Sequence, residues 1–467
     1  MLFSSISFLY YFLPAVTLLY FIVPFRFKNL VLLIASLFFY FYGEPIYTLL
    51  MIATIFVNYV CGLLIDRFRG TPIAKVSLWF SVIASLGSLG FFKYSDFFIS
   101  NVNSIFGSDF SLLKLALPIG ISFYTFQTMS YTIDVYRGDA KVQKSFIRLA
   151  TYVSLFPQLI AGPIVRYTTV EEDLTERTHS LEKISAGITR FVIGLSKKVL
   201  IADTLGALAR SLHASDEASV IGFWVYGIAV SLQLYFDFSG YSDMAIGLGK
   251  IFGFRFLENF NYPFISKSIG EFWRRWHMSL GTWFRDYVYI PMGGNRVSVP
   301  RWLLNTATVW FLTGFWHGAD WTFMLWGIYF AIFLVLEKFW LNKFFEKLPK
   351  VFSHIYVCVL IVISFVIFSA NGISGALSDL GKMFGAGGIP FWSAETGYYL
   401  GGYAIALIVA IFGSMPLLKN GVLKLKENEK INKVINVIEP IFVVVMLLIV
   451  TAYFVDGSFS PFLYFRF

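Results

Sequence analysis

The 467-residue sequence is 57% hydrophobic, 19% aromatic and only 14% charged, whereas a soluble domain carries nearer a quarter charged residues. This composition excludes a soluble nucleotide-binding fold, a disordered chain and a disulfide-rich scaffold, because each needs polar or cysteine-rich sequence. Since a spanning helix needs roughly 20 apolar residues, we predict an all-α, polytopic membrane protein with about 11 transmembrane helices plus re-entrant or interfacial helices.

The formal net charge is +9, which in a soluble protein would indicate nucleic acid. Here the basic residues flank apolar segments, and the positive-inside rule accounts for them. We therefore expect membrane lipid, and no nucleic acid, around the protein. Cys61 and Cys358 lie in apolar stretches without metal-ligand spacing and are interpreted as core residues.

Five apolar segments open the chain, near residues 5–23, 30–42, 46–65, 76–92 and 115–133. The loops between the first of them alternate in charge, with Arg26 and Lys28, then Glu44, then Arg67, Arg69 and Lys75. This alternation predicts that the basic loops, among them 66–75 and 134–148, lie in the cytoplasm.

Three further spans are expected near residues 354–370, 398–415 and 435–455, with a basic cytoplasmic loop at 419–433. Between 160 and 300 the apolar periodicity is poorer, and irregular backbone at membrane depth survives only where protein buries it or it lines a cavity. The sequence contains no internal repeat, so we predict one integral domain over residues 1–467.

The segment from Lys250 to Arg301 reads as a cytoplasmic-side segment that folds back into the protein, because aromatic residues, prolines and glycines interrupt it. It contains three acids and eight basic residues, Lys250, Arg255, Lys267, Arg274, Arg275, Arg285, Arg296 and Arg301. Such a segment is typical either of a helix at the membrane interface or of the wall of a binding site.

Within this segment, helical spacing over 271–277 would place Glu271 beside Arg274 and Arg275, and Trp273 beside His277. One interpretation is a charged helix at the membrane interface with Trp anchors. The other is a polar wall for an anionic cofactor, because guanidinium groups bind phosphate bidentately.

His317 follows an apolar segment, Trp302 to Trp316, of only about 15 residues, too short to cross a core of roughly 30 Å at 1.5 Å per residue. We therefore predict that the chain dips into the bilayer and returns, with His317 near the tip. An ionisable group at that depth indicates function, although a neutral structural histidine is the alternative.

Metal, nucleotide and hydrolase motifs are missing from the sequence. Of the five histidines, His277 and His317 are far apart and lack metal-ligand spacing, so we expect no metal. There is no Gly-x-Ser-x-Gly elbow, Walker motif or dinucleotide fingerprint, which weakens nucleophile and energy-coupling interpretations.

Six segments, in order along the chain, carry a family resemblance: Pro118–Gln127, Phe156–Pro163, Tyr235–Met244, Glu271–His277, Trp283–Pro291 and Gly314–Gly318. They resemble the membrane-bound O-acyltransferases, and within that family the membrane subunit of alginate O-acetylation. The match covers a core of about residues 118–340, and the aromatic C-terminus resembles the same subgroup. The resemblance implies this family's helical membrane fold.

The resemblance also implies site residues. His317 matches the family's nearly universal catalytic residue, and His277 its second functional histidine. A separate acyltransferase superfamily, acting on glycerolipids, uses His and Asp with four residues between them. Here Thr282 occupies that Asp position after His277, so that dyad is not implied.

By this resemblance we expect an O-acyltransferase of the plasma membrane. It would take an acyl group from a cytoplasmic thioester, most simply acetyl from acetyl-CoA, and move it across the membrane. The group would then be used for O-acetylation of a cell-surface polysaccharide. His317 would be the general base, and His277 would support the thioester end of the donor. Arg274, Arg275 and Arg285 would hold donor phosphate, and an exported partner acyltransferase would complete the transfer.

Two alternatives stay open at this point. Another branch of the family passes D-alanine from a carrier protein to teichoic acid, and it would share His317 but use a protein-bound donor. A non-enzymatic polysaccharide exporter belongs to a different class, and for it a His317→Ala variant would leave transport unaltered.

The charge pattern predicts that both termini lie outside and that the loops at 66–75, 134–148 and 419–433 lie inside. In a chain whose Cys61 and Cys358 are replaced by alanine, Lys426→Cys should react with a membrane-impermeant thiol reagent only after the cells are opened. Labelling of Lys426→Cys on intact cells would overturn the C-terminal half of this topology.

Overall fold

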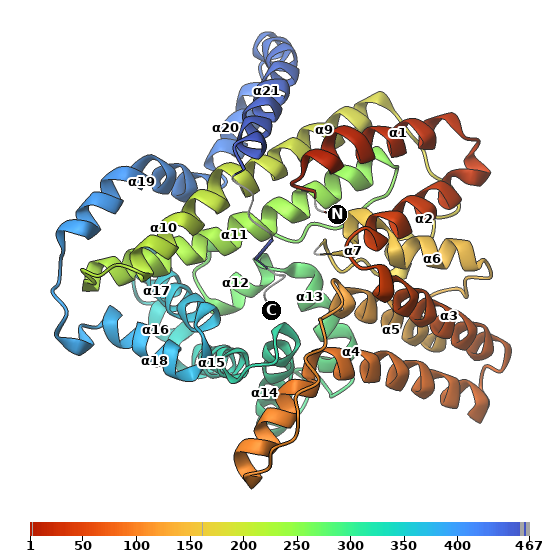
Figure 1. Cartoon of the computed structure of the whole chain (residues 1–467), viewed down its shortest axis with the longest axis horizontal. Coiled ribbons are helices and arrows are strands. Elements are labelled where there is room, and N and C mark those ends of the chain that lie inside the picture. Colours follow the sequence, from red (N-terminus) through yellow and green to blue (C-terminus); the bar gives the residue numbers. More distant parts are fainter. Residues whose placement is uncertain (2, 161, 458–461, 464–467) are drawn as a thin grey trace. The chain divides into compact units, whose positions relative to one another are not determined.

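The computed structural model describes residues 1, 3–160, 162–457 and 462–463. Ala161, inside the motif Phe156–Pro163, and most of the expected outer segment 456–467 lie outside the described residues. Over the described residues the secondary structure is helical, without a strand (Figure 1). The prediction of an all-α, polytopic membrane protein is confirmed.

Seven described helices are long and apolar enough to cross a membrane, against the expected total of about 11 spans. They cover Pro45–Arg67, Pro72–Phe106, Val220–Ile251, Trp321–Phe345, Lys350–Ser369, Ala394–Gly413 and Glu429–Val455. Other expected spans form shorter helices, such as Phe25–Phe41 and Ile121–Arg137 with 17 residues each. Hydropathy alone did not resolve where those helices end.

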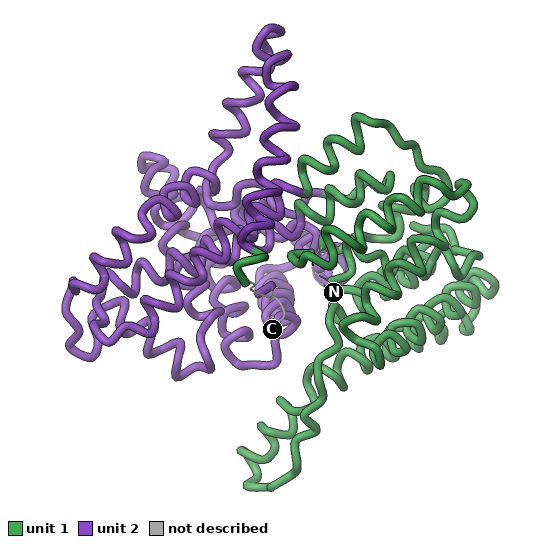
Figure 2. The backbone as a smooth tube through the Cα atoms, turned by 45° about the horizontal axis from the view of Figure 1, so that its top comes forward, with its two compact units in different colours: residues 1–191, 243–257, 454–461 green, residues 192–242, 258–453, 462–467 purple. Residues whose placement is uncertain are grey.

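The chain forms two compact units (Figure 2). Unit 1 comprises residues 1–191, 243–257 and 454–461. Its helices are η1 (Ser7–Phe12), α1 (Leu13–Ile22), α2 (Phe25–Phe41), α3 (Pro45–Arg67), α4 (Pro72–Phe106), α5 (Ile121–Arg137), α6 (Phe146–Ser154), α7 (Phe156–Leu159), α8 (Tyr167–Val170) and most of α9 (Leu181–Ser196). Helix α3 packs against α4 and α5, and α2 packs against α6.

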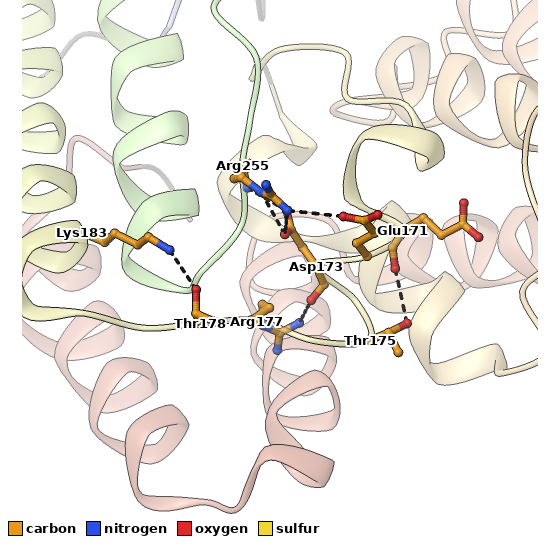
Figure 3. A network of polar contacts seen from close by, with 8 residues as sticks. Glu171, Asp173, Thr175, Arg177, Thr178, Lys183 and Arg255 are labelled. Atoms are coloured by element: carbon orange, nitrogen blue, oxygen red, sulfur yellow. Dashed lines mark hydrogen bonds and ion pairs between the residues drawn. The ribbon is translucent and has the colours of Figure 1, made fainter.

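A polar network ties the loop after α8 to the rest of unit 1 (Figure 3). The buried Arg177 donates to Asn29 Oδ1 at 2.7 Å and to the Asp173 carbonyl at 2.9 Å. Arg255 forms an ion pair with the Asp173 carboxylate at 3.3 Å. Arg255, one of the eight basic residues of the segment 250–301, therefore has a structural partner within its own unit.

Unit 2 comprises residues 192–242, 258–453 and 462–467. It contains η2 (Lys197–Ala202), α10 (Asp203–His213), much of α11 (Val220–Ile251), η3 (Pro263–Ile265), α12 (Ile269–Arg275), α13 (Met278–Phe284), η4 (Arg285–Tyr289), α14 (Val299–His317), α15 (Trp321–Leu336), η5 (Glu337–Leu341), α16 (Asn342–Phe345), α17 (Lys350–Ser369), α18 (Gly372–Met383), η6 (Ala386–Gly388), α19 (Ala394–Gly413), α20 (Leu417–Lys426) and α21 (Glu429–Val455). The unit boundaries fall inside α9, α11 and α21.

Helix α11 is a long apolar helix that the sequence pattern did not single out. Its 32 residues include Gln233, Asp237 and Ser239, which break the apolar pattern. All three are buried, so this helix keeps polar groups inside the protein and away from lipid, as the cost of exposing them to hydrocarbon requires.

Two polar groups fix the start of α12. The Ser268 hydroxyl caps the helix by accepting from the Glu271 N–H at 3.0 Å. The buried Glu337 carboxylate accepts from the backbone N–H groups of Ile269 and Gly270, where the positive end of the helix dipole favours an anion. A short, capped helix therefore carries the first half of the motif 271–277.

This helix ends earlier than the sequence pattern suggested. Glu271 and Arg275 do pair, at 2.9 Å, as helical spacing predicts. The prediction that Trp273 lies beside His277 is wrong, because α12 ends at Arg275 and His277 is left-handed, with φ 44° and ψ 51°. Trp273 instead packs against Trp310 and Phe330.

Helices α14 and α15 form an antiparallel hairpin, and His317 is the last residue of α14. Helix α14 has 19 residues rather than about 15, because it begins at Val299 with Pro300 in its first turn. At 1.5 Å per residue it spans about 28 Å, so its length does not require a dip. The position of His317 at the hairpin tip is confirmed, whereas its depth in the bilayer stays a prediction.

The ion pair between His213 of α10 and Asp379 of α18, with Nε2–Oδ1 at 3.1 Å, makes stability depend on pH. The hydrogen bond to Asp379 raises the pKa of His213, although partial burial opposes it. The ion pair therefore stabilises the fold fully at pH values below the pKa of histidine in the unfolded chain, about 6.5. This stabilisation is lost as the pH rises through the raised pKa of His213 in the folded protein. Because His213 is 46% exposed, we expect about 1 kcal/mol or less.

Thermal unfolding of the purified protein in detergent tests this. Asp379→Asn keeps the shape but removes the charge, so it should lower the unfolding midpoint at about pH 6 and match the unmodified protein at about pH 9. An equal difference at both pH values would show that the charge of His213 plays no part.

Candidate functional site

His317 is buried in an aromatic cage at the end of α14. Its ring packs edge-on against Trp326 of α15 and Phe368 of α17, with centroid separations of 5.2 and 5.3 Å. The neighbouring Trp316 contacts it at 5.1 Å. Aromatic walls on several sides limit the rotation of the imidazole and separate it from bulk solvent.

The hairpin brings these rings together because its two helices approach unusually closely. A Cβ on Gly314 would collide with the Phe323 carbonyl of α15, and one on Gly327 would collide with the Trp310 carbonyl of α14. Small residues at such positions allow backbone-to-backbone packing in membrane proteins. The glycines therefore set the distance between α14, which carries His317, and α15, which carries Trp326.

A small cavity of about 30 Å³ adjoins His317. It is lined by Leu234, Asp237, Phe238, Trp276, His317, Trp326, Phe365, Phe368, Phe462 and Leu463. The space admits one or two waters, far less than an acyl thioester occupies. The cavity is mainly apolar, with His317 and Asp237 as its ionisable groups.

Asp237 belongs to a buried ionic group on the side of α11. Its carboxylate lies 3.1 Å from Lys198 Nζ, and Lys198 also pairs with Asp203. The Leu463 N–H donates to the second Asp237 oxygen at 2.8 Å. The two carboxylates and the ammonium compensate part of each other's desolvation, and the Asp237 carboxyl group lies at the cavity wall.

His277 lies behind Trp316 and does not line the cavity. The Trp316 ring contacts both imidazoles, at centroid separations of 6.1 Å to His277 and 5.1 Å to His317. Phe238 packs edge-on against His277 at 4.7 Å. The structure thus brings the two predicted histidines into one cluster, joined by a shared aromatic ring.

The surroundings of His277 keep it uncharged. It is 2% exposed, and burial lowers its pKa to about 3, so the imidazole is neutral at physiological pH. Its Nδ1 lies 3.1 Å from Asn259 Oδ1. Asn259 itself is completely buried.

The three arginines predicted as phosphate ligands are distributed along the surface of this region. Arg275 donates to Glu271 and to the Asn261 carbonyl, and Arg285 pairs through two nitrogens with Asp286. Arg274 is exposed at the end of α12. Of the three, Arg274 is the one that forms no salt bridge within the described residues.

Two polar residues of this cluster, Asp237 and Asn259, were not predicted from the sequence. Asp237 stands in the motif Tyr235–Met244, and an ionisable residue in an apolar helix was the signal that could have identified it. Asn259 carried no such signal, because only the fold places it against His277. Among the described residues, no group of three or more His, Cys, Asp or Glu side chains is arranged to hold a metal ion.

These groups can support proton transfer in a site shielded from bulk water. A buried neutral imidazole accepts a proton readily when a nearby carboxylate compensates the positive charge that forms. Asp237 lines the same cavity as His317. Such an arrangement suits activation of a hydroxyl group for attack on an acyl carbon.

Comparison with known proteins points the same way. Residues 137–378 match the model of the membrane-bound O-acyltransferase family. The chain is 42% identical over 427 residues to a Pseudomonas aeruginosa protein named probable alginate O-acetylase AlgI, covering 88% of this chain and 81% of that protein. It is 36% identical to a Helicobacter pylori peptidoglycan O-acetyltransferase, covering 83% and 81%, and 32% identical to a Bacillus subtilis teichoic acid D-alanyltransferase, covering 55% and 68%.

The close approach of α14 and α15 is open to a direct test. Gly327→Ala should push the helices apart and cost about 1–3 kcal/mol of stability, lowering the thermal unfolding midpoint in detergent. Gly402→Ala in α19 is the matched control, because a Cβ there meets nothing within 4 Å. An unchanged midpoint for Gly327→Ala would mean that the hairpin tolerates a wider spacing.

Proposed function

The chain belongs to the membrane-bound O-acyltransferase family, and from this premise we propose that it moves an acetyl group from a cytoplasmic thioester across the membrane for O-acetylation of a cell-surface polysaccharide. It is a multi-pass membrane O-acyltransferase. The observation that carries the finer proposal is the buried His317, held in an aromatic cage on a cavity that it shares with Asp237. The plasma membrane is the proposed location.

His317 acts as the general base in this proposal. Its imidazole takes the proton of the acceptor hydroxyl, the oxygen attacks the thioester carbonyl carbon, and the carbon–sulfur bond breaks. The departing thiolate then receives a proton from the imidazolium, so His317 is neutral again. The negative charge of Asp237 favours the transient imidazolium.

Acetyl-CoA is the proposed donor, entering from the cytoplasm, and no metal takes part. Arg274, Arg275 and Arg285 are proposed to contact its phosphates. Because Arg275 and Arg285 already share carboxylates, Arg274 is the foremost candidate. His277 supports the donor end of the site.

The acceptor reaches His317 from outside, so the acyl group crosses the membrane while the bulky donor stays inside. An exported partner acyltransferase is proposed to complete transfer to the polymer. Membrane lipid is proposed to surround the present chain. The match to acetylating relatives extends over more of the chain than the match to the D-alanyltransferase, which favours acetyl over D-alanyl. Membership of an acyltransferase family removes the exporter alternative.

The role of His317 is tested with purified protein in liposomes and radiolabelled acetyl-CoA. His317→Ala should lower acyl transfer by about 10²-fold or more while donor binding is kept, and His277→Ala should act partly through donor affinity. If His317→Ala keeps normal turnover and His277→Ala does not, the two roles are reversed. Transfer by both variants at the normal rate would contradict the proposal.

The proposed contact between Arg274 and donor phosphate is tested by Arg274→Lys. This substitution keeps the positive charge but removes the planar guanidinium group, which can donate two parallel hydrogen bonds to one phosphate. We expect a KM for acetyl-CoA raised about 10-fold with little change in kcat. Arg255→Lys, whose side chain is tied to Asp173 in unit 1, serves as the control. An unchanged KM for Arg274→Lys would remove that residue from the donor site.

A further inference from the structure

We propose that Asn259 fixes His277 in its Nδ1–H tautomer, so that Nε2 is a hydrogen-bond acceptor for an N–H or O–H group of a bound substrate. Asn259 is thus a positioning residue for the second histidine of the site. The inference deepens the proposed acyl transfer and rests on it for the identity of the substrate, but its tautomer part stands on hydrogen-bond geometry and on the burial of His277.

The orientation of the Asn259 amide is determined by a group that can only donate. The backbone N–H of Ser279 points at one end of the amide, at 3.2 Å, so this end must be the oxygen. The other end, the NH₂ group, lies 3.1 Å from Ser242 Oγ, which can accept. Reversing the amide would set two donors against each other at the Ser279 backbone.

The tautomer of His277 follows from that orientation. Its Nδ1 faces the same Asn259 oxygen at 3.1 Å, and an oxygen that only accepts requires a proton on Nδ1. In a neutral imidazole one nitrogen carries the proton and the other carries a lone pair. Because burial holds His277 neutral, Nε2 must carry the lone pair.

The lone pair on Nε2 has no partner within the part of the chain that the structure describes, although the atom is buried. Its residue is 2% exposed, and a buried polar atom without a hydrogen bond costs about 1–3 kcal/mol. The rings of Phe238 and Trp316 contact this imidazole. An acceptor kept unsatisfied in a functional cluster points to a ligand that satisfies it.

The backbone supports the same interpretation. His277 has φ 44° and ψ 51°, a left-handed conformation that costs a non-glycine residue about 1–3 kcal/mol. The Asn259 carbonyl accepts from the next N–H, that of Met278, at 2.9 Å. One residue, Asn259, therefore holds both the strained backbone and the imidazole of His277.

This tautomer limits what His277 can contact. A thioester carbonyl oxygen only accepts hydrogen bonds, so Nε2 without a proton cannot bind it. Suitable partners are an amide N–H of the donor's pantetheine arm or the hydroxyl of the acceptor. His277 and His317 thus need different partners during transfer.

The tautomer is measured by solid-state ¹⁵N NMR of histidine-labelled protein in liposomes, with His277→Gln used to identify the His277 signals by difference. We expect a protonated Nδ1 and an unprotonated Nε2 in the unmodified protein. Asn259→Ala should mix the tautomers, whereas Asn259→Asp should protonate both nitrogens, because a carboxylate stabilises imidazolium. A protonated Nε2 in the unmodified protein would overturn the inference, even if the variants fail to fold.

One variant controls for nonspecific effects. Asn261→Ala changes an exposed amide of the same loop. It should keep the tautomer and the transfer rate. If Asn259→Ala also keeps both, Asn259 does not position His277.

Transfer from radiolabelled acetyl-CoA distinguishes the two partner groups. Asn259→Ala should lower kcat/KM at least about 10-fold, since a wrong histidine tautomer can cost up to about 10⁴-fold in a hydrolase. A raised KM for acetyl-CoA would assign Nε2 to the donor amide, and a lowered kcat at constant KM to the acceptor hydroxyl. Absence of transfer by the unmodified protein, with the expected NMR spectrum, would contradict the proposed function but leave the tautomer assignment intact.

Discussion

The close approach of α14 to α15 is the constraint on which the site depends. Gly314 and Gly327 leave no side chain between the two backbones, so the last turn of α14 lies directly against the first turns of α15. His317 consequently meets Trp326 and Phe368 at ring-contact distance. A wider hairpin would leave the imidazole free to rotate and open to water.

Around this apolar frame the protein buries polar groups, and several of those near the site hold one another in place. Lys198 joins Asp203 and Asp237, and Asn259 joins Ser242, His277 and Ser279. In a medium of low dielectric constant such pairs are stronger than in water, and a buried polar group without a partner is more costly. The site is therefore pre-organised by contacts that would be weak at a surface.

The two histidines differ because their neighbours differ. His317 faces a cavity that is also lined by a carboxyl group, an environment that can stabilise a protonated imidazole. His277 is enclosed by Phe238, Trp316 and a neutral amide, an environment that favours the uncharged ring. Two chemically identical side chains thus suit two different tasks.

The sequence by itself determined the fold class and the family, and it singled out both histidines as candidate site residues. Its low charge content excludes a soluble fold, and the ordered motifs from Pro118 to Gly318 identify the acyltransferase family. It also placed His317 at a hairpin tip. Each of these features depends on composition or on residues close together in the sequence. It can therefore be inferred without knowing which distant residues are in contact.

Only the tertiary structure decided the length of α14, the early end of α12 and the neighbours of His277. Asn259 stands 18 residues from His277 and Lys198 stands 39 residues from Asp237, distances at which helical or strand spacing carries no information. Those contacts arise from how helices pack and which polar groups burial forces together. The chemical state of His277 is therefore a property of the fold, whereas its identity is a property of the sequence.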